Sequence, residues 1–314
     1  MRKLRIVFMG TPGFAVGVLE AILKKYEVVG VVTAPDKPAG RGQKVKESAV
    51  KAFATTNGLN VLQPTNLKSE EFLEELKALE ANVQVVVAFR MLPEAVWNMP
   101  EYGTFNLHAS LLPDYRGAAP INWAIINGET ATGVTTFFID DKIDTGAIIL
   151  QQQTNLSAHE NAGQLHDRLM QLGSDLVVET LDVISNGNVT TTIQSESPNS
   201  KPAPKLTKEN CKIDWNQSGK DIYNLIRGLS PYPAAWCYFM DGENKWNVKI
   251  YEAKIRFEDH GESIGKIAAT KKAIEIAVKG GYLEIINLQL PGKKIMSAAE
   301  LLNGMTFSAN SKAI

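Results

Sequence analysis

Two polar residues, Asn106 and His108, stand two positions apart at the end of the segment GTFNLH. The segment predicts a strand over residues 104–108, and alternate side chains of a strand point to the same face. An amide and an imidazole that share a crevice can donate hydrogen bonds to a carbonyl oxygen as it gains negative charge, and the imidazole can also move a proton. The alternative is a core histidine that is bonded to a backbone carbonyl.

A second segment, GVTTFFIDDKIDTGAIIL, is an apolar strand that ends in three acidic residues, Asp140, Asp141 and Asp144. A carboxylate at this place can face the same crevice. There it would hold the imidazole in one tautomer and help to take the proton of an amine that attacks a carbonyl. The alternative is that these loop acids are solvated turn formers.

The elements that must position these residues alternate between strand and helix. Strands are predicted over residues 4–9, 27–33, 83–88, 104–108 and 134–139, and helices over residues 14–24, 70–79, 121–127 and 159–185. Strands that are apolar on both faces are typical of a parallel sheet covered by helices. The predicted fold is therefore α/β, a Rossmann-like, doubly wound and mostly parallel sheet that binds ligands at the carboxyl ends of its strands.

The first turn of this domain, Gly10-Thr11-Pro12-Gly13, does not match a dinucleotide-binding loop. That loop needs three glycines at fixed spacing and an acidic residue at the end of the second strand, where this chain has Thr33-Ala34-Pro35. The turn is predicted to join a strand to a helix or to border a different ligand.

The composition changes after residue 188, where Thr, Ser, Pro and Lys dominate. We predict a catalytic domain over residues 1–188, a linker over residues 189–207 and a second domain over residues 208–314. One helical segment, residues 218–228, precedes short strand-like runs separated by turn residues. This pattern predicts a small all-β barrel of the OB-like type, a class that often binds oligonucleotides or tRNA, although a small β-sandwich would have a similar pattern.

The charge of the 314-residue chain is divided unevenly. Residues 1–200 carry 16 basic and 22 acidic side chains, a net charge of −6, and residues 201–314 carry 17 and 12, a net charge of +5. The total of −1 excludes a wholly basic, histone-like protein. A basic second part is expected if that part contacts a polyanion, and ordinary scatter of surface charge is the alternative.

The two cysteines, Cys211 and Cys237, have neither the spacing of a zinc site nor a disulfide framework, so reduced and buried thiols are expected. The apolar run at the start of the chain is broken at Gly10, and no long apolar segment follows. We therefore expect a cytoplasmic protein without a signal peptide or membrane span. No heptad pattern or long apolar edge requires a partner, which favours a monomer.

The combination of NLHASLLPDYRGAAPI with GVTTFFIDDKIDTGAII resembles the two signatures of the folate-dependent formyltransferases. The resemblance implies 10-formyltetrahydrofolate as the donor, no metal, and a catalytic set of Asn106, His108 and Asp144. It also implies that the turn Ser110-Leu111-Leu112-Pro113 contacts the folate.

Further segments are similar to the branch of this family that formylates methionyl initiator tRNA. They are the opening MRKLRIVFMGTPGFA, the basic loop APDKPAGRGQKVKESAVK and the segment KPAPKLTKENCKIDWNQSGKDIYNLIRGLSPYPAAW. The resemblance places Arg41 against the acceptor end of the tRNA. The neighbouring Lys37, Lys44 and Lys46 are expected to bind phosphates, and the basic second domain to extend that contact.

The chain departs from the family pattern at three places. Gly13 replaces a common Asp, Arg90 replaces a common Gly in the exit of the third predicted strand, and Asp114-Tyr115 precede Arg116 where a basic residue often stands. Details of the contact with the pterin ring therefore do not carry over at Gly13 and Arg90.

Several other functions compete with this interpretation. Formyltransferases that act on amino sugars or on a ribonucleotide, and hydrolases of the formyl donor, share the catalytic signatures. They have no reason to carry the Arg41 loop or a basic barrel. A non-catalytic RNA-binding protein with an OB-like module would explain the basic second half but not the combination of Asn106, His108 and Asp144.

Overall fold

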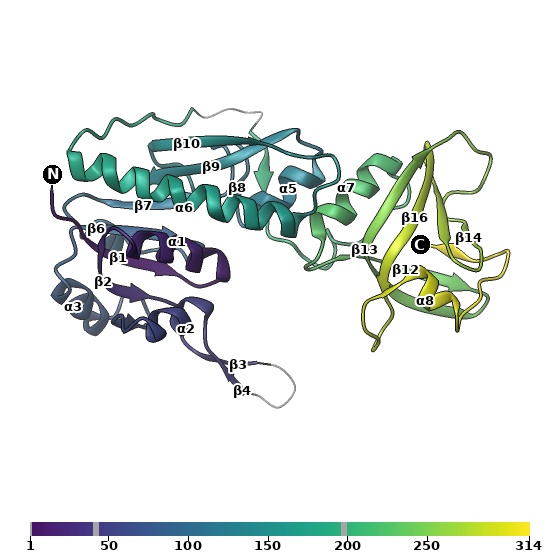
Figure 1. Ribbon diagram of the computed structural model, residues 1–314, viewed down its shortest axis with the longest axis horizontal. Helices are drawn as coiled ribbons and strands as arrows, with labels where there is room; N and C mark the ends of the chain where they lie inside the picture. Colours follow the sequence, from purple (N-terminus) through teal and green to yellow (C-terminus); the bar gives the residue numbers. More distant parts are fainter. Residues whose placement is uncertain (1, 40–43, 196–199) are drawn as a thin grey trace. The chain divides into compact units, whose positions relative to one another are not determined.

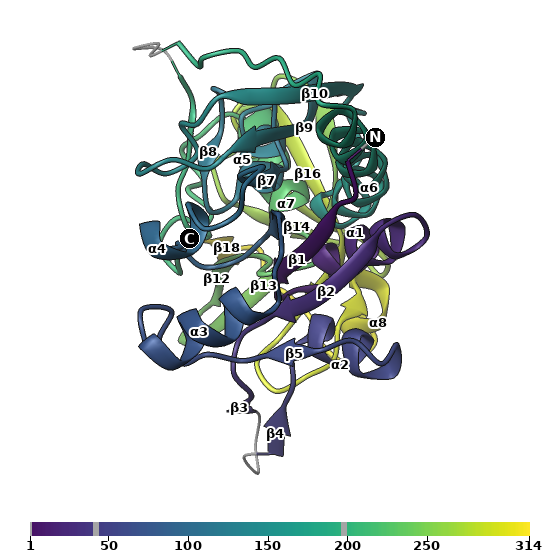
Figure 2. The ribbon, with the colours of Figure 1, turned by 90° about the vertical axis from the view of Figure 1, so that its left-hand side faces the viewer.

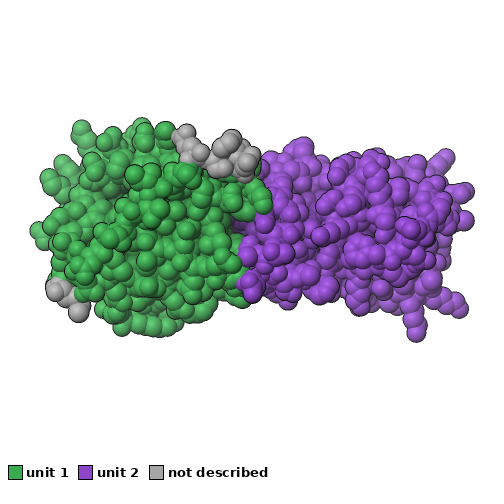
Figure 3. All heavy atoms as spheres, turned by 90° about the horizontal axis from the view of Figure 1, so that it is seen from above, with its two compact units in different colours: residues 1–117, 132–154, 166–202 green, residues 118–131, 155–165, 203–314 purple. Residues whose placement is uncertain are grey.

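The structure, a computed structural model, describes residues 2–39, 44–195 and 200–314. The chain forms two compact units, coloured separately in Figure 3. Unit 1 consists of residues 1–117, 132–154 and 166–202, and unit 2 consists of residues 118–131, 155–165 and 203–314. The units interleave along the sequence, and the domain boundaries predicted at residues 188 and 208 remain a prediction.

Unit 1 is built on a seven-stranded sheet. In sheet order, its strands are β10 (Ile148–Asn155), β9 (Ala131–Phe138), β7 (Thr104–His108), β6 (Val83–Val87), β1 (Arg5–Gly10), β2 (Glu27–Val32) and β5 (Val61–Leu62). The pairs from β7 through β6, β1 and β2 to β5 are parallel, whereas β9 runs antiparallel to β7. The predicted α/β class with a mostly parallel sheet is confirmed.

Helices cover both faces of this sheet (Figures 1 and 2). They are α1 (Gly13–Leu23), α2 (Ala49–Thr56), α3 (Glu70–Ala78), α4 (Glu94–Trp97) and α6 (Ala162–Asn186). Figure 2 shows α1 and α6 on one face and α3 and α4 on the other. Val7 and Met9 of β1 pack in a core cluster with Phe72 of α3 and Val96 of α4, and the intervening Phe8 is also fully buried. Burial on both faces explains the continuous apolar runs of the central strands.

Unit 2 contains an antiparallel, nearly closed barrel. Its strands are β12 (Ala235–Asp241), β13 (Asn244–Phe257), β14 (Ile267–Ala269), β15 (Ile274–Val278), β16 (Gly281–Gln289), β17 (Met296–Ser297) and β18 (Lys312–Ala313). The order is β14-β15-β16-β13-β12-β18. The two ends of this order meet, because Ile267 donates to the Ser311 carbonyl at 2.9 Å and Ala313 donates to the Gly265 carbonyl at 2.7 Å. The predicted small β-barrel is confirmed.

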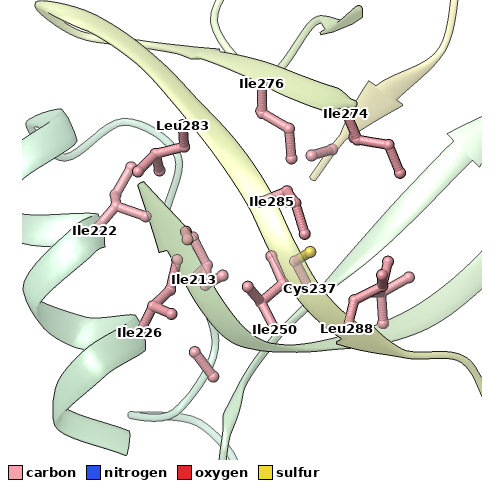
Figure 4. Close-up of a cluster of buried hydrophobic side chains, with 14 of the residues drawn as sticks. Ile213, Ile222, Ile226, Cys237, Ile250, Ile274, Ile276, Leu283, Ile285 and Leu288 are labelled. Carbon is pink, nitrogen blue, oxygen red and sulfur yellow. The ribbon is translucent and has the colours of Figure 1, made fainter. Parts of the chain in front are cut away.

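The interior of the barrel is aliphatic and is closed by α7 (Gly219–Leu229). Figure 4 shows Ile222 and Ile226 of this helix among the buried side chains of the barrel. Both cysteines are free and buried in the same cluster, and burial raises the pKa of each thiol. Unit 2 also contains α5 (Pro120–Ile126), which packs on α7, and α8 (Ala298–Leu302). The short strands β8 (Arg116–Gly117) and β11 (Pro202–Ala203) complete the described elements of regular structure outside the basic loop.

The barrel core yields a stability prediction at Ile285, which is 1% exposed and lies close to Cys237 and Ile250 in Figure 4. Replacement by Ala leaves a cavity, and we expect the free energy of unfolding of this unit to fall by about 2–5 kcal/mol. Chemical denaturation followed by tryptophan fluorescence measures the change. The control is Ile295→Ala, because Ile295 is 53% exposed and should cost less than about 0.5 kcal/mol. Equal losses in both variants would contradict the assignment of this core.

In the described part of the chain, no helix is both long and apolar enough to cross a membrane.

Candidate active site

Strand β7 places Asn106 and His108 on the face of the sheet that is turned away from α6. The residue between them, Leu107, packs against Gly173 of α6, where a Cβ atom would lie 2.7 Å from Leu107 Cδ2. Since neighbouring side chains of a strand point to opposite faces, Asn106 and His108 share the other face. The predicted strand and the shared face are confirmed by this register.

The imidazole of His108 is buried and held by the loop that follows β7. Its Nε2 lies 2.8 Å from the carbonyl oxygen of Tyr115, which can only accept, so Nε2 carries a proton and donates it to this bond. Tyr115 has φ +61°, which is rare for a bulky residue. The alternative predicted from the sequence, a histidine bonded to a backbone carbonyl, therefore holds for Nε2. The other nitrogen, Nδ1, is left for a second role.

That second nitrogen faces Asp144. Asp144 Oδ2 lies 3.8 Å from His108 Nδ1, beyond direct hydrogen-bond length, and accepts a hydrogen bond from the backbone N–H of Gly117 at 2.9 Å. The carboxylate is mostly buried, with 15% of its side chain exposed. A neutral imidazole that donates through Nε2 presents a lone pair on Nδ1, so the pair can share one incoming proton.

Asp144 lies beside His108 although the strand that precedes it, β9, runs antiparallel to β7. Because β9 is antiparallel to β7, the carboxyl end of β9 lies at the opposite edge of the sheet from His108. The loop after β9 folds back over the sheet, and the N–H of Phe138 donates to the carbonyl of Ala147 at 3.0 Å. A Cβ on Gly146 would lie 1.6 Å from the Phe138 carbonyl oxygen, so only glycine allows this close return.

The other two acids of that loop do not join the pair. Asp140 accepts hydrogen bonds from Thr145 Oγ1 at 2.8 Å and from the N–H of Lys142 at 3.1 Å, which makes it a turn former. Asp141 is exposed. Of the three carboxylates in the segment, Asp144 lies beside His108.

The side-chain amide of Asn106 forms no hydrogen bond with the described residues. The side chain is half-buried. Leu112, Phe137 and Ile148 form a small buried apolar cluster, and Phe137 lies opposite Asn106 in the register of β7 and β9. An amide without a partner among the described residues, next to a buried apolar cluster, is suited to bind a polar atom of a ligand.

The turn expected to contact folate is fixed by internal hydrogen bonds. Ser110 is buried, and its hydroxyl donates to the Asp114 carbonyl at 2.7 Å. Thr135 Oγ1 donates to the Ser110 carbonyl at 2.7 Å and accepts from the N–H of Leu112 at 3.2 Å. The side chain of Leu112 is buried, whereas Leu111 and Pro113 are half-buried. Leu111 and Pro113 thus offer the accessible side-chain surface of this turn.

The basic loop forms a short hairpin in which β3 (Lys37–Ala39) pairs with β4 (Lys44–Lys46). Lys37 and Lys46 are exposed and lie directly opposite each other. Like charges at opposed positions repel each other, and an anionic ligand relieves this repulsion. Arg41 lies outside the described residues, as does the side chain of Lys44.

The base of the hairpin is held by Asp36. Its carboxylate pairs with Lys51 and accepts a hydrogen bond from Gln63 Nε2 at 2.8 Å, and these bonds hold the pKa of Asp36 below its ordinary value. Asp36, one of the two acids in the basic loop, is therefore already paired with a residue of α2.

Two of the departures from the family pattern have clear positions. A Cβ on Gly13 would have no heavy atom within 4 Å, so this position has room for a larger residue. Arg90 is exposed, and its guanidinium donates to the carbonyls of Pro64 and, at 3.2 Å, of Thr65. Arg90 thus ties two loops of unit 1 together.

Comparison with known families decides the assignment. The sequence model of the formyl transferase family matches residues 4–181, and that of the formyl transferase C-terminal domain matches residues 205–306. The chain belongs to the formyl transferase family. A methionyl-tRNA formyltransferase from Flavobacterium johnsoniae is 66% identical over 99% of both chains. One from Bacteroides thetaiotaomicron is 51% identical over 97% of both.

Solved structures support the fold of this family member. A sugar 3N-formyl transferase, WlaRD, crystallised with dTDP and 5-N-formyl-THF, superimposes with a TM-score of 0.66 at 22% identity, covering 94% of this chain and all of the other. HypX from Aquifex aeolicus in complex with tetrahydrofolic acid gives a TM-score of 0.64 at 18% identity, covering 96% of this chain and 47% of the other. At these identities the likeness concerns the fold.

The sequence did not indicate two backbone groups of this formyl transferase site. They are the Tyr115 carbonyl, which fixes the His108 tautomer, and the Gly117 N–H, which binds Asp144. Among the described residues, no cluster of three or more His, Cys, Asp or Glu side chains is arranged to hold a metal ion.

Proposed function

We propose that this chain transfers the formyl group of 10-formyltetrahydrofolate to the α-amino group of methionyl initiator tRNA. The observation that carries the proposal is the 66% identity, over 99% of both chains, to a methionyl-tRNA formyltransferase. Both regions of the family are present, so the match includes the barrel as well as the catalytic sheet.

The site has features that fit a folate donor. The Asn106 amide has no hydrogen-bond partner in the described residues, and it lies beside Phe137 of the buried apolar cluster. Leu111 and Pro113 of the turn are accessible to a flat aromatic group. The bound donor supplies an activated formyl group, whose bond to a folate nitrogen breaks as the new bond to the amine forms.

The residues of the chain have separate roles in this proposal. Asn106 donates a hydrogen bond to the formyl oxygen as negative charge develops on it, which stabilises the transition state. His108 Nδ1 and Asp144, 3.8 Å apart, receive the proton that the attacking amine loses and return it to the folate nitrogen as the bond of that nitrogen to the formyl carbon breaks. Because Nε2 is engaged by the Tyr115 carbonyl, proton transfer is assigned to Nδ1.

Recognition of the tRNA is assigned to basic groups. Lys37 and Lys46 project from the hairpin, Arg41 and Lys44 belong to the same loop, and the net charge of +5 over residues 201–314 adds further attraction. Contacts of this kind bind phosphates and weaken as salt is added. We propose further that the protein acts as a monomer in the cytoplasm, where charged tRNA is found, and light scattering measures its oligomeric state.

Formyl transfer from 10-formyltetrahydrofolate by the purified chain tests the function. Charged methionyl initiator tRNA, charged methionyl elongator tRNA and free methionine are compared as acceptors under one condition. We expect a strong preference for the initiator tRNA. Equal formylation of the two tRNAs would contradict the proposed specificity for the initiator tRNA. Consumption of the donor without formylated tRNA would point to another acceptor or to hydrolysis.

The role of the hairpin predicts a change in salt dependence. In the variant Lys37→Ala/Lys46→Ala, the slope of log(kcat/KM) for tRNA against log of the salt concentration should fall in magnitude by about 2, since each lost phosphate contact accounts for about 1. The charge-matched control is Lys68→Ala/Lys77→Ala, because both lysines are exposed and lie at α3 or just before it. An unchanged slope in the hairpin variant would remove these lysines from the tRNA site.

A further inference from the structure

A glutamine outside both catalytic segments, Gln194, forms hydrogen bonds near the site with both polar atoms of its side chain. Gln194 is 8% exposed, and its Nε2 donates to the carbonyls of Asp144 at 3.0 Å and Gly146 at 2.7 Å. Its Oε1 accepts from Arg116, at 3.1 Å from Nε and 2.6 Å from Nη2. The side chain thus bonds to three residues in two separate loops.

These two loops carry the partners of His108 and Asp144. The first contains Tyr115, whose carbonyl holds His108, and Gly117, whose N–H binds the Asp144 carboxylate. The second contains Asp144 itself. The distance of 3.8 Å between His108 Nδ1 and Asp144 Oδ2 therefore depends on how the two loops lie relative to each other. The side chain of Gln194 bonds to both loops, to Arg116 in the first and to the carbonyls of Asp144 and Gly146 in the second.

The backbone around Gln194 is also anchored. Thr192 and Ile148 exchange two backbone hydrogen bonds of 2.8 Å each. On the other side, the N–H of Lys201 donates to Asp114 Oδ1 at 3.0 Å, and the N–H of Tyr115 donates to the Lys201 carbonyl. Residues of the stretch predicted as a linker thus bond to strand β10 and to the loop that holds His108.

Asp144 has an unusual backbone conformation that Gln194 supports. Its φ of +55° is a left-handed conformation that is seldom populated outside glycine, asparagine and aspartate. Two hydrogen bonds to the carbonyls of Asp144 and Gly146 support the backbone on both sides of Thr145. Such support is required where a strained backbone conformation must be maintained.

We infer that Gln194 is a positioning residue for formyl transfer, which sets the separation of His108 and Asp144 by joining their loops. This inference rests on the proposed function, because it assigns that pair to proton transfer. Gln194 acts on the chemical step and not on tRNA binding, since its side chain is buried against the catalytic loops. A displacement of about 1 Å at a reacting group is enough to lower a rate by about 100-fold.

Two variants of Gln194 test the inference, one that removes all hydrogen bonds of the side chain and one that removes only those donated by Nε2. Gln194→Met keeps the length of the side chain and removes all of its hydrogen bonds. Gln194→Glu keeps acceptors for Arg116 but turns a carboxylate oxygen toward the carbonyls of Asp144 and Gly146. The control is Gln153→Ala, because Gln153 is exposed on β10 and its side chain has no hydrogen bond to the described residues. Circular dichroism at the assay temperature gives the folded fraction, by which each kcat is divided.

We expect kcat to fall by about 10- to 100-fold in both Gln194 variants, with KM for methionyl-tRNA within about threefold of the original and Gln153→Ala unchanged. A kcat within twofold of the original in Gln194→Glu would overturn the inference, because the bonds to the Asp144 loop would then be unnecessary. A rise in KM with kcat preserved would also overturn it. If the unsubstituted chain does not formylate methionyl-tRNA, the proposed function fails, whatever the variants do.

Discussion

Replacing Asp144 by Asn is expected to lower kcat for formyl transfer by about 10²- to 10⁴-fold, the range for a lost acid–base group. The substitution removes the charge and little else. Asn can accept the hydrogen bond from the Gly117 N–H, and it tolerates the φ of +55° better than most residues. The loss in kcat would therefore report the charge 3.8 Å from His108 Nδ1 and not a distorted loop.

Steady-state kinetics with methionyl initiator tRNA measures this effect. Asp141→Asn is the matched control, since Asp141 is an exposed acid of the same loop, and it should retain full activity. Thermal unfolding should show the same midpoint for Asp144→Asn and the original chain to within a few degrees. If Asp144→Asn kept more than a third of the original kcat, the carboxylate would have no part in proton transfer.

The sequence was sufficient to predict Asn106 and His108 as a pair because the periodicity of a strand depends on residue spacing alone. Asp144 was predicted from a weaker argument, in which its strand delivers it to the same crevice. The structure shows β9 antiparallel to β7, so the loop must fold back to bring Asp144 to His108. Gly146 permits the loop to fold back, but the Thr145-Gly146 pair in the sequence does not show in which direction the loop will run.

The remaining parts of the site use groups that have no sequence signature. Every residue has a carbonyl and every residue except proline an N–H, so nothing marks the Tyr115 carbonyl or the Gly117 N–H in advance. Gln194 lies in a polar stretch whose composition is typical of a linker. Its role depends on which loops fold beside it, and only the tertiary structure determines that.

Strands β10 and β12 were also harder to predict, the first because it lies at the edge of its sheet and the second because of its apolar composition. The run IILQQQTN forms β10 at the end of the seven-stranded order, where three consecutive glutamines are exposed. An edge strand can be polar, because only part of it packs on a core. The run AWCYFMD forms β12 but is apolar at consecutive positions, a pattern that does not separate strand from helix.

Replacing Asn106 by Ala should lower kcat by about 10²- to 10³-fold, the usual cost of losing one donor to a developing oxyanion. The same change should leave the unfolding midpoint unaltered, because the amide forms no hydrogen bond with the described residues of the protein. A lower kcat with an unchanged unfolding midpoint distinguishes an amide that binds a ligand from one that stabilises the fold. A structural amide would lower the midpoint and kcat together.

Two comparisons complete that experiment. Asn188→Ala is the control, since Asn188 is exposed beyond α6 and should retain the original kcat. Asn106→Asp keeps the shape but replaces the donor with a negative charge, so it should be no more active than Asn106→Ala. If Asn106→Asp were instead nearly as active as the original chain, the amide could not be a donor to negative charge. Formyl transfer would then depend on His108 and Asp144 alone among the three residues.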